Sequence, residues 1–256
     1  MHRARDLAPA RRVLLAALVL VATPVLGEEM PRPFEAGETL TYQVSLGRWG
    51  AGGKGSLKVE ESEPVRGEPV VQLSFDFATR IGPFSVRHSS RSWLSTQQMT
   101  SLRYEVDEKA PFNDLREKVE IFPAEKRWKG LEGDGDSPTV QPLDELSYLY
   151  LLRTLVLGDG DRMELHRHFD PRRNPAMVRV LRRETVQVPA GEFAAVVVEM
   201  KVRDPHRLGG QGVMRLHVSD DARRLLLRIE SEVPVVGRLV LELLPDPTTL
   251  AGNPQP

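Results

Sequence analysis

The stretch Thr39-Leu40-Thr41-Tyr42-Gln43-Val44-Ser45-Leu46 decides the fold class, because its apolar and polar residues alternate over its whole length. Successive side chains of a β-strand point to opposite faces of the sheet. Strict alternation therefore predicts a strand with one buried and one solvated face, which is typical of antiparallel sheets.

The same alternation recurs along most of the chain. Further runs lie at 56–60, 71–77, 84–94, 99–106, 115–122, 177–188, 193–202, 212–219, 224–231 and 235–243. Turn signals separate them, namely Gly50-Ala51-Gly52-Gly53, Gly82-Pro83, Gly133-Asp134-Gly135, Pro189-Ala190-Gly191 and Gly209-Gly210. Since a sheet of so many strands tends to curl, we expect an all-β, mainly antiparallel domain, a strongly curved sheet or incomplete barrel of roughly a dozen strands. We place this single domain at residues 28–245 and a flexible tail at 246–256.

One segment has a different pattern and predicts a central helix. Residues 142–158 carry leucine on most helical faces, with Asp144 able to cap the start and Gly158 able to end the helix. A helix that is apolar on most sides should be enclosed by the sheet. We therefore expect Leu146, Leu149 and Leu152 to be buried.

The first 27 residues have the layout of a cleavable signal peptide. A basic start with four arginines precedes the apolar run Val13–Leu26, and small Gly27 follows, so we expect the mature chain to begin at Glu28. An uncleaved anchor is the alternative, but the apolar run is shorter than the about 20 residues that a bilayer span needs. No later stretch is apolar enough to span a membrane. We expect an exported protein, in the periplasm or outside the cell.

Composition narrows the class further. The chain has no cysteine, so it cannot be a lipoprotein acylated at cysteine and has no disulfides. Removal of residues 1–27 takes away four arginines and one aspartate, which leaves 31 basic and 35 acidic residues. This mild, interspersed acidity argues against nucleic-acid binding, which uses a clustered basic face.

His166 and His168 are the best metal candidates, because residues two apart on a strand share a face and Asp170 follows closely. The alternative is a solvated strand face with two exposed histidines. Two ligands do not make a site, so we expect no tightly bound metal and no cofactor.

The sequence patterns that could indicate a catalytic site are weaker than the pattern of the two histidines. His88 stands next to Ser89-Ser90, but neighbours on a strand point to opposite faces, and there is no Gly-x-Ser-x-Gly elbow. The acidic pairs Asp107-Glu108, Asp134 with Asp136, and Asp220-Asp221 lie in turn-like sequence, where such residues serve turn geometry. The run 50–56 (GAGGKGS) superficially resembles a phosphate loop, but alternation resumes directly after it, which favours a hairpin turn.

Several aromatic residues are candidates for lining a ligand cavity, and core packing is the competing interpretation. These candidates are Trp49, Phe75, Phe77, Trp93 and Tyr150.

Four pieces in chain order resemble a bacterial exported family known as domain of unknown function 3108. They are 34–42 (FEAGETLTY), 144–147 (DELS) with Tyr150 and Arg153, 188–193 (VPAGEF), and 218–224 (VSDDARR) followed by 237–239 (GRL). The resemblance implies a bacterial envelope protein without an agreed activity. It marks as structural positions Gly37, Glu38, Tyr42, Asp144, Arg153, Gly191, Phe193, Asp220, Asp221 and Gly237. The chain departs from the family at His217, where tryptophan is usual, and around Leu226, where proline is usual.

These observations favour a non-enzymatic exported binding or carrier protein over an enzyme, with an apolar or glycan ligand such as envelope lipid or polysaccharide. A structural or assembly partner of an envelope protein complex is the second hypothesis, and a hydrolase is the third. An elongated apolar pocket would favour a carrier, and a solid core with an exposed apolar patch would favour an assembly partner. Convergent carboxylates or a His/Ser pair in a cleft would favour an enzyme.

Overall fold

The structure is a computed structural model that describes residues 32–246, except 48–49, 82–83, 111–112, 132, 204–210 and 234–236. By its internal contacts the chain divides into residues 1–31 and residues 32–256, and only the second unit is described below. The predicted signal peptide, and the predicted tail beyond residue 246, lie outside the described residues.

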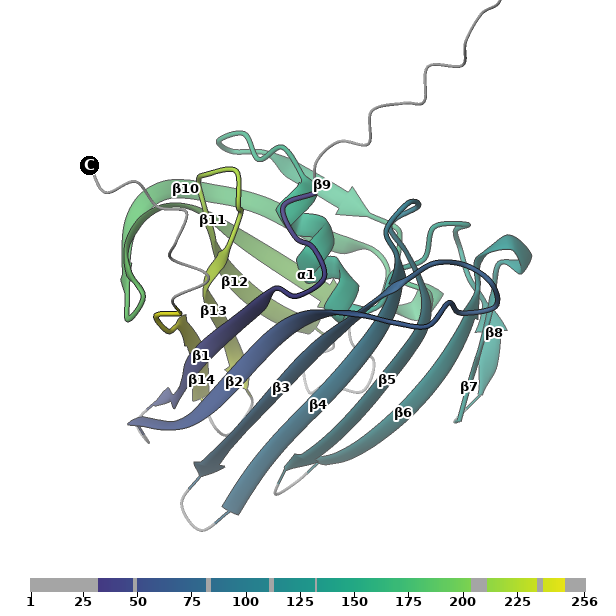
Figure 1. The fold of residues 1–256 in the computed structure, drawn as a ribbon, viewed down its shortest axis with the longest axis horizontal. Helices are drawn as coiled ribbons and strands as arrows, with labels where there is room; N and C mark the ends of the chain where they lie inside the picture. Colours follow the sequence, from purple (N-terminus) through teal and green to yellow (C-terminus); the bar gives the residue numbers. More distant parts are fainter. Residues whose placement is uncertain are drawn as a thin grey trace, which may run out of the picture. The chain divides into compact units, whose positions relative to one another are not determined.

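One antiparallel sheet of 14 strands forms the protein (Figure 1), which confirms the predicted all-β fold. Its strands are β1 Thr39–Leu46, β2 Gly50–Glu61, β3 Val71–Ile81, β4 Phe84–Ser95, β5 Thr100–Ala110, β6 Asn113–Phe122, β7 Arg127–Gly130, β8 Asp134–Asp136, β9 Arg162–Leu165, β10 Ala176–Val188, β11 Gly191–Arg203, β12 Gln211–Ser219, β13 Leu226–Val233 and β14 Gly237–Leu243. The spatial order is β8-β7-β6-β5-β4-β3-β2-β1-β14-β13-β12-β11-β10-β9, so β8 and β9 are the edges. The first half of the chain therefore runs one way from β1 and the second half returns to pair β14 with β1.

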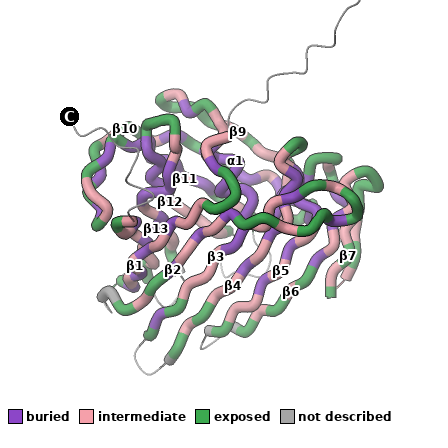
Figure 2. Tube along the Cα trace, viewed as in Figure 1, coloured by how far each residue is buried: buried purple, intermediate pink, exposed green. Residues whose placement is uncertain are grey.

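Helix α1 (Glu145–Thr154) connects the two edge strands and lies inside the curve of the sheet (Figure 1). Leu146, Leu149 and Leu152 are 3%, 5% and 1% exposed, which confirms their predicted burial. They share one hydrophobic core with residues from both halves of the sheet. Buried positions in Figure 2 accordingly follow α1 and the strand segments next to it.

Helix α1 begins where the sequence predicts but ends earlier. Asp144 is the N-cap, as predicted, and it accepts hydrogen bonds from the backbone N–H groups of Leu146 and Ser147. The C-terminal end is earlier than the predicted Gly158, because Leu155 is already extended. The carbonyl oxygens just beyond α1 bind arginines: Arg224 donates to Leu155 and Arg183 to Leu157.

Three further predictions from the sequence need correction. The glycine-rich stretch 50–53 forms the start of β2 and is not a turn, and its pairing with β1 contains a register shift at Val44/Ser45. Asp107 and Glu108 lie within β5, which extends to Ala110, and Asp134 and Asp136 lie in β8, so neither acidic pair is in a turn. The short strands β7, β8 and β9 carry too few alternating residues to be recognised in the sequence.

Candidate functional site

Burial on the concave face of β2–β6 falls with distance from α1. The row of paired residues nearest the helix is at most 4% exposed and consists of Val59, Leu73, Ser92, Tyr104 and Val119. Two rows further along the strands, Gly55 is buried, but its register partners Phe77, His88, Glu108 and Leu115 are only half-buried. In Figure 2 the ends of β3–β6 farthest from α1 are correspondingly mostly intermediate or exposed, with Thr79 on β3 as a buried exception. The helix therefore covers only one end of the concave face.

Phe75, Phe77 and His88 form a ring cluster at this less covered end. The centroids of the two phenylalanine rings are 5.5 Å apart, and the His88 imidazole stacks on Phe77 at 5.3 Å with an interplanar angle of 12°. Both phenylalanines pack against the main core but keep part of their surface exposed. Gly55 leaves room for Phe77, because a Cβ atom there would lie 3.2 Å from Phe77 Cβ. The cluster is an apolar surface with a polar residue at its border.

His88 links this apolar surface to two polar groups. Its Nδ1 lies 2.9 Å from Glu108 Oε2, and its Nε2 lies 3.3 Å from Ser90 Oγ. Ser90 shares a face with His88 because it is two residues further along β4, whereas the sequence argument considered only their neighbour relationship. The three side chains stand in the order of a serine–histidine–acid relay.

The surroundings of Ser90 do not support acyl transfer. Strand β4 is paired with β3 on one side and with β5 on the other across Ser90, so the sheet uses the backbone N–H groups there. Stabilising a tetrahedral oxyanion requires N–H donors that are free to bind it. The backbone N–H groups beside Ser90 are therefore taken up by strand pairing and do not offer an oxyanion hole.

The other half of the sheet also carries half-buried apolar residues that pack against the same core. They lie near the ends of β11, β12 and β14 and are Val202, Met214 and Leu239. We give the name distal surface to the half-buried Phe75, Phe77 and Leu115 on β3 and β6 alone. These three side chains and the His88 group form the candidate binding site.

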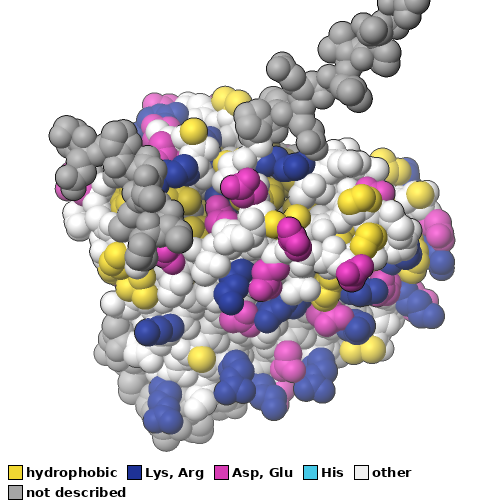
Figure 3. Space-filling model, viewed as in Figure 1, with side chains coloured by type: hydrophobic (Ala, Val, Ile, Leu, Met, Phe, Trp, Pro, Cys, Tyr) yellow, Lys and Arg dark blue, Asp and Glu magenta, His cyan; other side chains and the backbone are white. Residues whose placement is uncertain are grey.

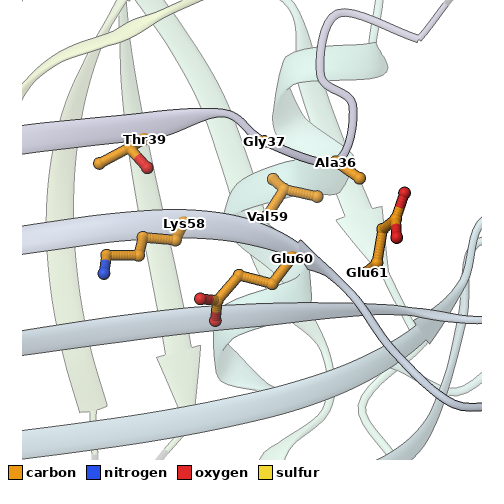
Figure 4. Close-up of a pocket in the computed structure, with 7 residues that line it drawn as sticks. All are labelled: Ala36, Gly37, Thr39, Lys58, Val59, Glu60 and Glu61. Carbon is orange, nitrogen blue, oxygen red and sulfur yellow. The ribbon is translucent and has the colours of Figure 1, made fainter.

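Two shallow grooves lie on the surface. One, of about 400 Å³, lies where the segment before β1 runs beside β2 (Figure 4), and its lining consists of Ala36, Gly37, Thr39, Lys58, Val59, Glu60 and Glu61. The other, of about 460 Å³, lies over β1–β4, and its lining includes Thr41, Ser56, Asp76 and Ser89 on the convex face. Lys54 and Arg87 also line it, as do Phe77 and His88 of the candidate site. Both grooves are open to solvent and lined mainly by polar or small residues, unlike typical apolar ligand pockets.

The five aromatic cavity candidates do not come together. Phe75 and Phe77 lie in the distal surface, whereas Trp93 lies on the convex face in a separate cluster with Val65, Val70 and Leu102. Tyr150 is fully buried in the core, packs edge-on against Phe34 at 4.9 Å, and donates a hydrogen bond to the carbonyl oxygen of Lys58. Trp49 lies outside the described residues.

The metal candidates His166 and His168 also differ in their surroundings. The His166 side chain is 64% exposed, whereas that of His168 is fully buried. His168 Nδ1 accepts a hydrogen bond from the backbone N–H of Asp170, and its Nε2 lies 3.2 Å from Glu145 Oε1. The carboxylate of Asp170 binds Arg172. In the part of the chain that the structure describes, no group of three or more potential ligands is arranged around a metal position.

Charged groups are buried at the N-terminus of α1. Burial raises the pKa of Asp144 to about 6, although hydrogen bonds from Ser92, Ser147 and Ser101 oppose this shift. Burial also acts to raise the pKa of Glu145, but the charges of Arg173 and His168 outweigh it and hold that pKa well below its ordinary value. This network fixes the helix to β4 and β5 through Ser92 and Ser101 and is enclosed by the core.

The family-motif residues mostly hold the helix in the sheet. The Arg153 guanidinium binds Glu38 and the carbonyl oxygens of Pro33, Arg223 and Arg224. Tyr42 donates to the carbonyl oxygen of Leu226 at 2.8 Å, and Phe193 is buried in the core.

The remaining motif residues shape turns. Gly37, Gly191 and Gly237 have φ values of 100°, 134° and 92°, which favour glycine. Asp220 and Asp221 lie at the β12–β13 turn, where Asp221 pairs with Arg223, as the sequence predicted.

His88, Glu108 and Ser90 were not recognised as a group from the sequence. Their alternation along β4 was visible, but the register that places Glu108 opposite His88 is a tertiary property. Among the described residues no helix is long and apolar enough to cross a bilayer.

The fold resembles that of a solved β-barrel-like structure. A β-barrel-like protein of domain of unknown function DUF1849 from Brucella abortus matches with a TM-score of 0.51 and 8% identity, over 81% of this chain and 95% of that chain. This likeness supports the curved β-sheet architecture.

Two further structures match at lower TM-scores. A protein from Bacteroides fragilis, described as exported and as having a YmcC-like fold, has a TM-score of 0.34 and 12% identity, over 84% of this chain and 97% of that chain. A protein from Parabacteroides distasonis, described as a lipoprotein, has a TM-score of 0.35 and 12% identity, over 84% of this chain and 96% of that chain. Their shared geometry is too limited to support an argument about this protein.

Among curated proteins none matches this sequence. The family model described as protein of unknown function DUF3108 matches residues 41–244, which span β1 to β14 and include Asp144, Arg153 and Gly191. Because this match covers most of the chain and the whole sheet that positions the helix, the chain belongs to the DUF3108 family.

Proposed function

We propose that the protein binds an apolar or amphipathic ligand on its distal surface and has no catalytic role. The observation that carries this proposal is the half-buried pair Phe75 and Phe77, stacked with His88 at the end of the concave face that α1 leaves uncovered. Covering such apolar surface contributes roughly 25 cal/mol per Å².

The polar side chains of His88 and Glu108 beside the phenylalanines indicate the class of ligand. An acyl chain or another extended apolar group would lie across Phe75, Phe77 and Leu115. Its polar group would lie beside His88 and Glu108, which can together donate and accept hydrogen bonds. The ligand would occupy an open surface, since the core next to α1 is closely packed by side chains that are almost fully buried. Envelope lipids have this amphipathic character.

Fluorescence of phenylnaphthylamine, an apolar dye, tests this site. We expect the dye to bind the purified mature protein, and Phe75→Ala with Phe77→Ala to reduce its affinity by about tenfold or more, because one lost aromatic contact is worth about a kcal/mol. Phe122→Ala is the matched control. Phe122 is also a half-buried phenylalanine, but it lies between Arg66 and Arg127. Equal losses in both variants, or no dye binding by the wild type, would exclude the distal surface as the site.

A role as assembly partner is the second candidate, and the packed core favours it. The distal surface would then cover an apolar segment of another envelope protein. Native mass spectrometry of protein purified from its own source separates the two: retained small molecules support the ligand proposal, and a stoichiometric protein partner with no small molecule supports assembly.

Export belongs to the same proposal. The basic, apolar and small-residue order of residues 1–27 supports cleavage after Gly27 and a location in the periplasm. N-terminal sequencing should find Glu28 as the first residue. A retained Met1 would contradict this.

A further inference from the structure

Basic side chains gather on the convex face at the same end of the sheet as the distal surface. Lys54, Arg87 and Lys109 lie in one row of paired residues across β2–β5, with Ala78 between the first two, and Arg80 lies one row further along β3. All four basic side chains are exposed. In the face shown in Figure 3, Lys and Arg side chains gather along the lower edge, where β2–β6 end. We call these four residues the basic rim.

The acidic residues beside the basic rim include Asp76, which lines the same groove as Lys54 and Arg87. Across the described ranges none of the four makes an ion pair, whereas Arg91 on the same face pairs with Asp76 and Arg116 pairs with Asp107. Arg87 faces Lys109 directly across β4 and β5, and like charges in directly opposed positions destabilise a sheet. Asp114, opposite Lys109 on β6, is the one acidic residue in their row on these strands. A bound anionic surface would remove the repulsion between Arg87 and Lys109.

We propose that the basic rim docks this end of the protein on a membrane surface rich in anionic lipid. Lys and Arg attract phosphate headgroups, and the half-buried Phe77 and Leu115, on the concave face of the same strand ends, would then lie close to the bilayer surface. Docking in this way would place the distal surface where an amphipathic molecule can move between the membrane and the protein. This inference rests on the proposed ligand site for its purpose, but it makes a separate prediction about membranes.

Vesicle co-sedimentation tests the proposal with the full mature chain. We expect binding to vesicles of phosphatidylcholine mixed with phosphatidylglycerol, and little binding to phosphatidylcholine alone. Each basic residue near an anionic surface contributes about fivefold in affinity, so Lys54→Gln, Arg87→Gln and Lys109→Gln together should weaken binding about a hundredfold. Higher salt should weaken wild-type binding as well, because the Debye length is only about 10 Å at 0.1 M.

A matched control has the same change in charge. Arg162 and Arg179 also face each other on the convex side, at the β9 edge, and Lys129 is exposed on β7. Replacing these three by glutamine should leave vesicle binding unchanged. Equal loss in both triple variants, or equal binding to neutral and anionic vesicles, would overturn the proposal. Binding to soluble polyphosphate without any binding to anionic vesicles would overturn it too.

The dye assay keeps the two proposals distinct. The basic-rim variant should bind phenylnaphthylamine like the wild type, since its substitutions lie on the convex face. Phe75→Ala with Phe77→Ala should lose dye and still sediment with anionic vesicles. Loss of dye binding in the basic-rim variant would show that the substitutions damage the fold or the distal surface, and it would contradict the independence of the two sites.

Discussion

The Glu38 carboxylate accepts two hydrogen bonds from the Arg153 guanidinium, which lies 115 positions later in the sequence. Nη1 lies 2.5 Å from Oε1, and Nη2 lies 2.7 Å from Oε2. The Arg153 side chain is fully buried, and its remaining donors bind backbone carbonyl oxygens next to β1 and in the β12–β13 turn. Phe34 and Tyr150 each have a ring centroid 5.5 Å from the guanidinium carbon. This contact joins the C-terminal end of α1 to both halves of the sheet.

Breaking this pair should destabilise the protein strongly. Arg153→Met leaves the Glu38 carboxylate without its partner, and breaking a buried pair in this way costs about 3–5 kcal/mol. Urea unfolding of the mature chain gives the change in free energy. Arg116→Met is the control, because the Arg116 side chain is 71% exposed and its pair with Asp107 should contribute below about 1 kcal/mol. Similar small changes in both variants would show that Arg153 does not hold α1 in place.

The leucines of α1 should each contribute through core packing. Leu146→Ala, Leu149→Ala and Leu152→Ala remove side chains that are at most 5% exposed, and each should cost about 2–5 kcal/mol. Val156→Ala, just beyond the helix, is a matched control, since Val156 is 90% exposed. Thermal midpoints that hardly move in all three leucine variants would contradict the enclosed position of the helix.

Asp144 should make stability depend on pH between about 4 and 6. Its pKa of about 6 in the folded protein lies above the ordinary value of 3.8, so the folded state binds the proton more tightly than the unfolded state. The resulting stabilisation is complete below about pH 4 and is lost as the pH rises through 6, amounting to up to about 3 kcal/mol.

The comparison with Asp144→Asn isolates this effect, because asparagine keeps an N-cap oxygen but does not titrate. Glu145 has its pKa shifted in the opposite direction, and it should contribute equally to both proteins. The free energy of unfolding of the wild type minus that of the variant should therefore fall from pH 4 to pH 6 and stay constant above it. A difference that is flat, or that rises with pH, would refute the buried-carboxylate explanation.

His166 and His168 should hold no stoichiometric metal. The two His168 nitrogens face the backbone N–H of Asp170 and the Glu145 carboxylate, and the His166 side chain points into solvent, so the two imidazoles do not share a site. Elemental analysis after purification without chelator or affinity tag checks this. About one zinc or copper per chain that disappears in His166→Ala with His168→Ala would reverse the conclusion.

Local pattern determined most of the secondary structure. Alternation located eleven of the strands, because a strand with one buried face shows its period in its own residues. The cap at Asp144 and the left-handed glycines at 37 and 191 were equally visible, since each depends on a few neighbouring residues. The early end of α1 was not, because the arginines that bind the carbonyl oxygens just beyond it, at Leu155 and Leu157, come from β10 and the β12–β13 turn.

Only the tertiary structure decided the candidate site. Phe77 and Trp93 both lie in alternating strands, yet one faces the less covered part of the concave side and the other lies on the convex side beside Val65, Val70 and Leu102. His88 meets Glu108 because β4 and β5 pair in one particular register. The alternation of a strand and the capping of a helix depend on residues close together in the sequence. The register between strands, and the part of the sheet that α1 covers, depend on contacts between residues far apart in the chain. The sequence alone therefore predicts the strands but not the surface that they leave exposed.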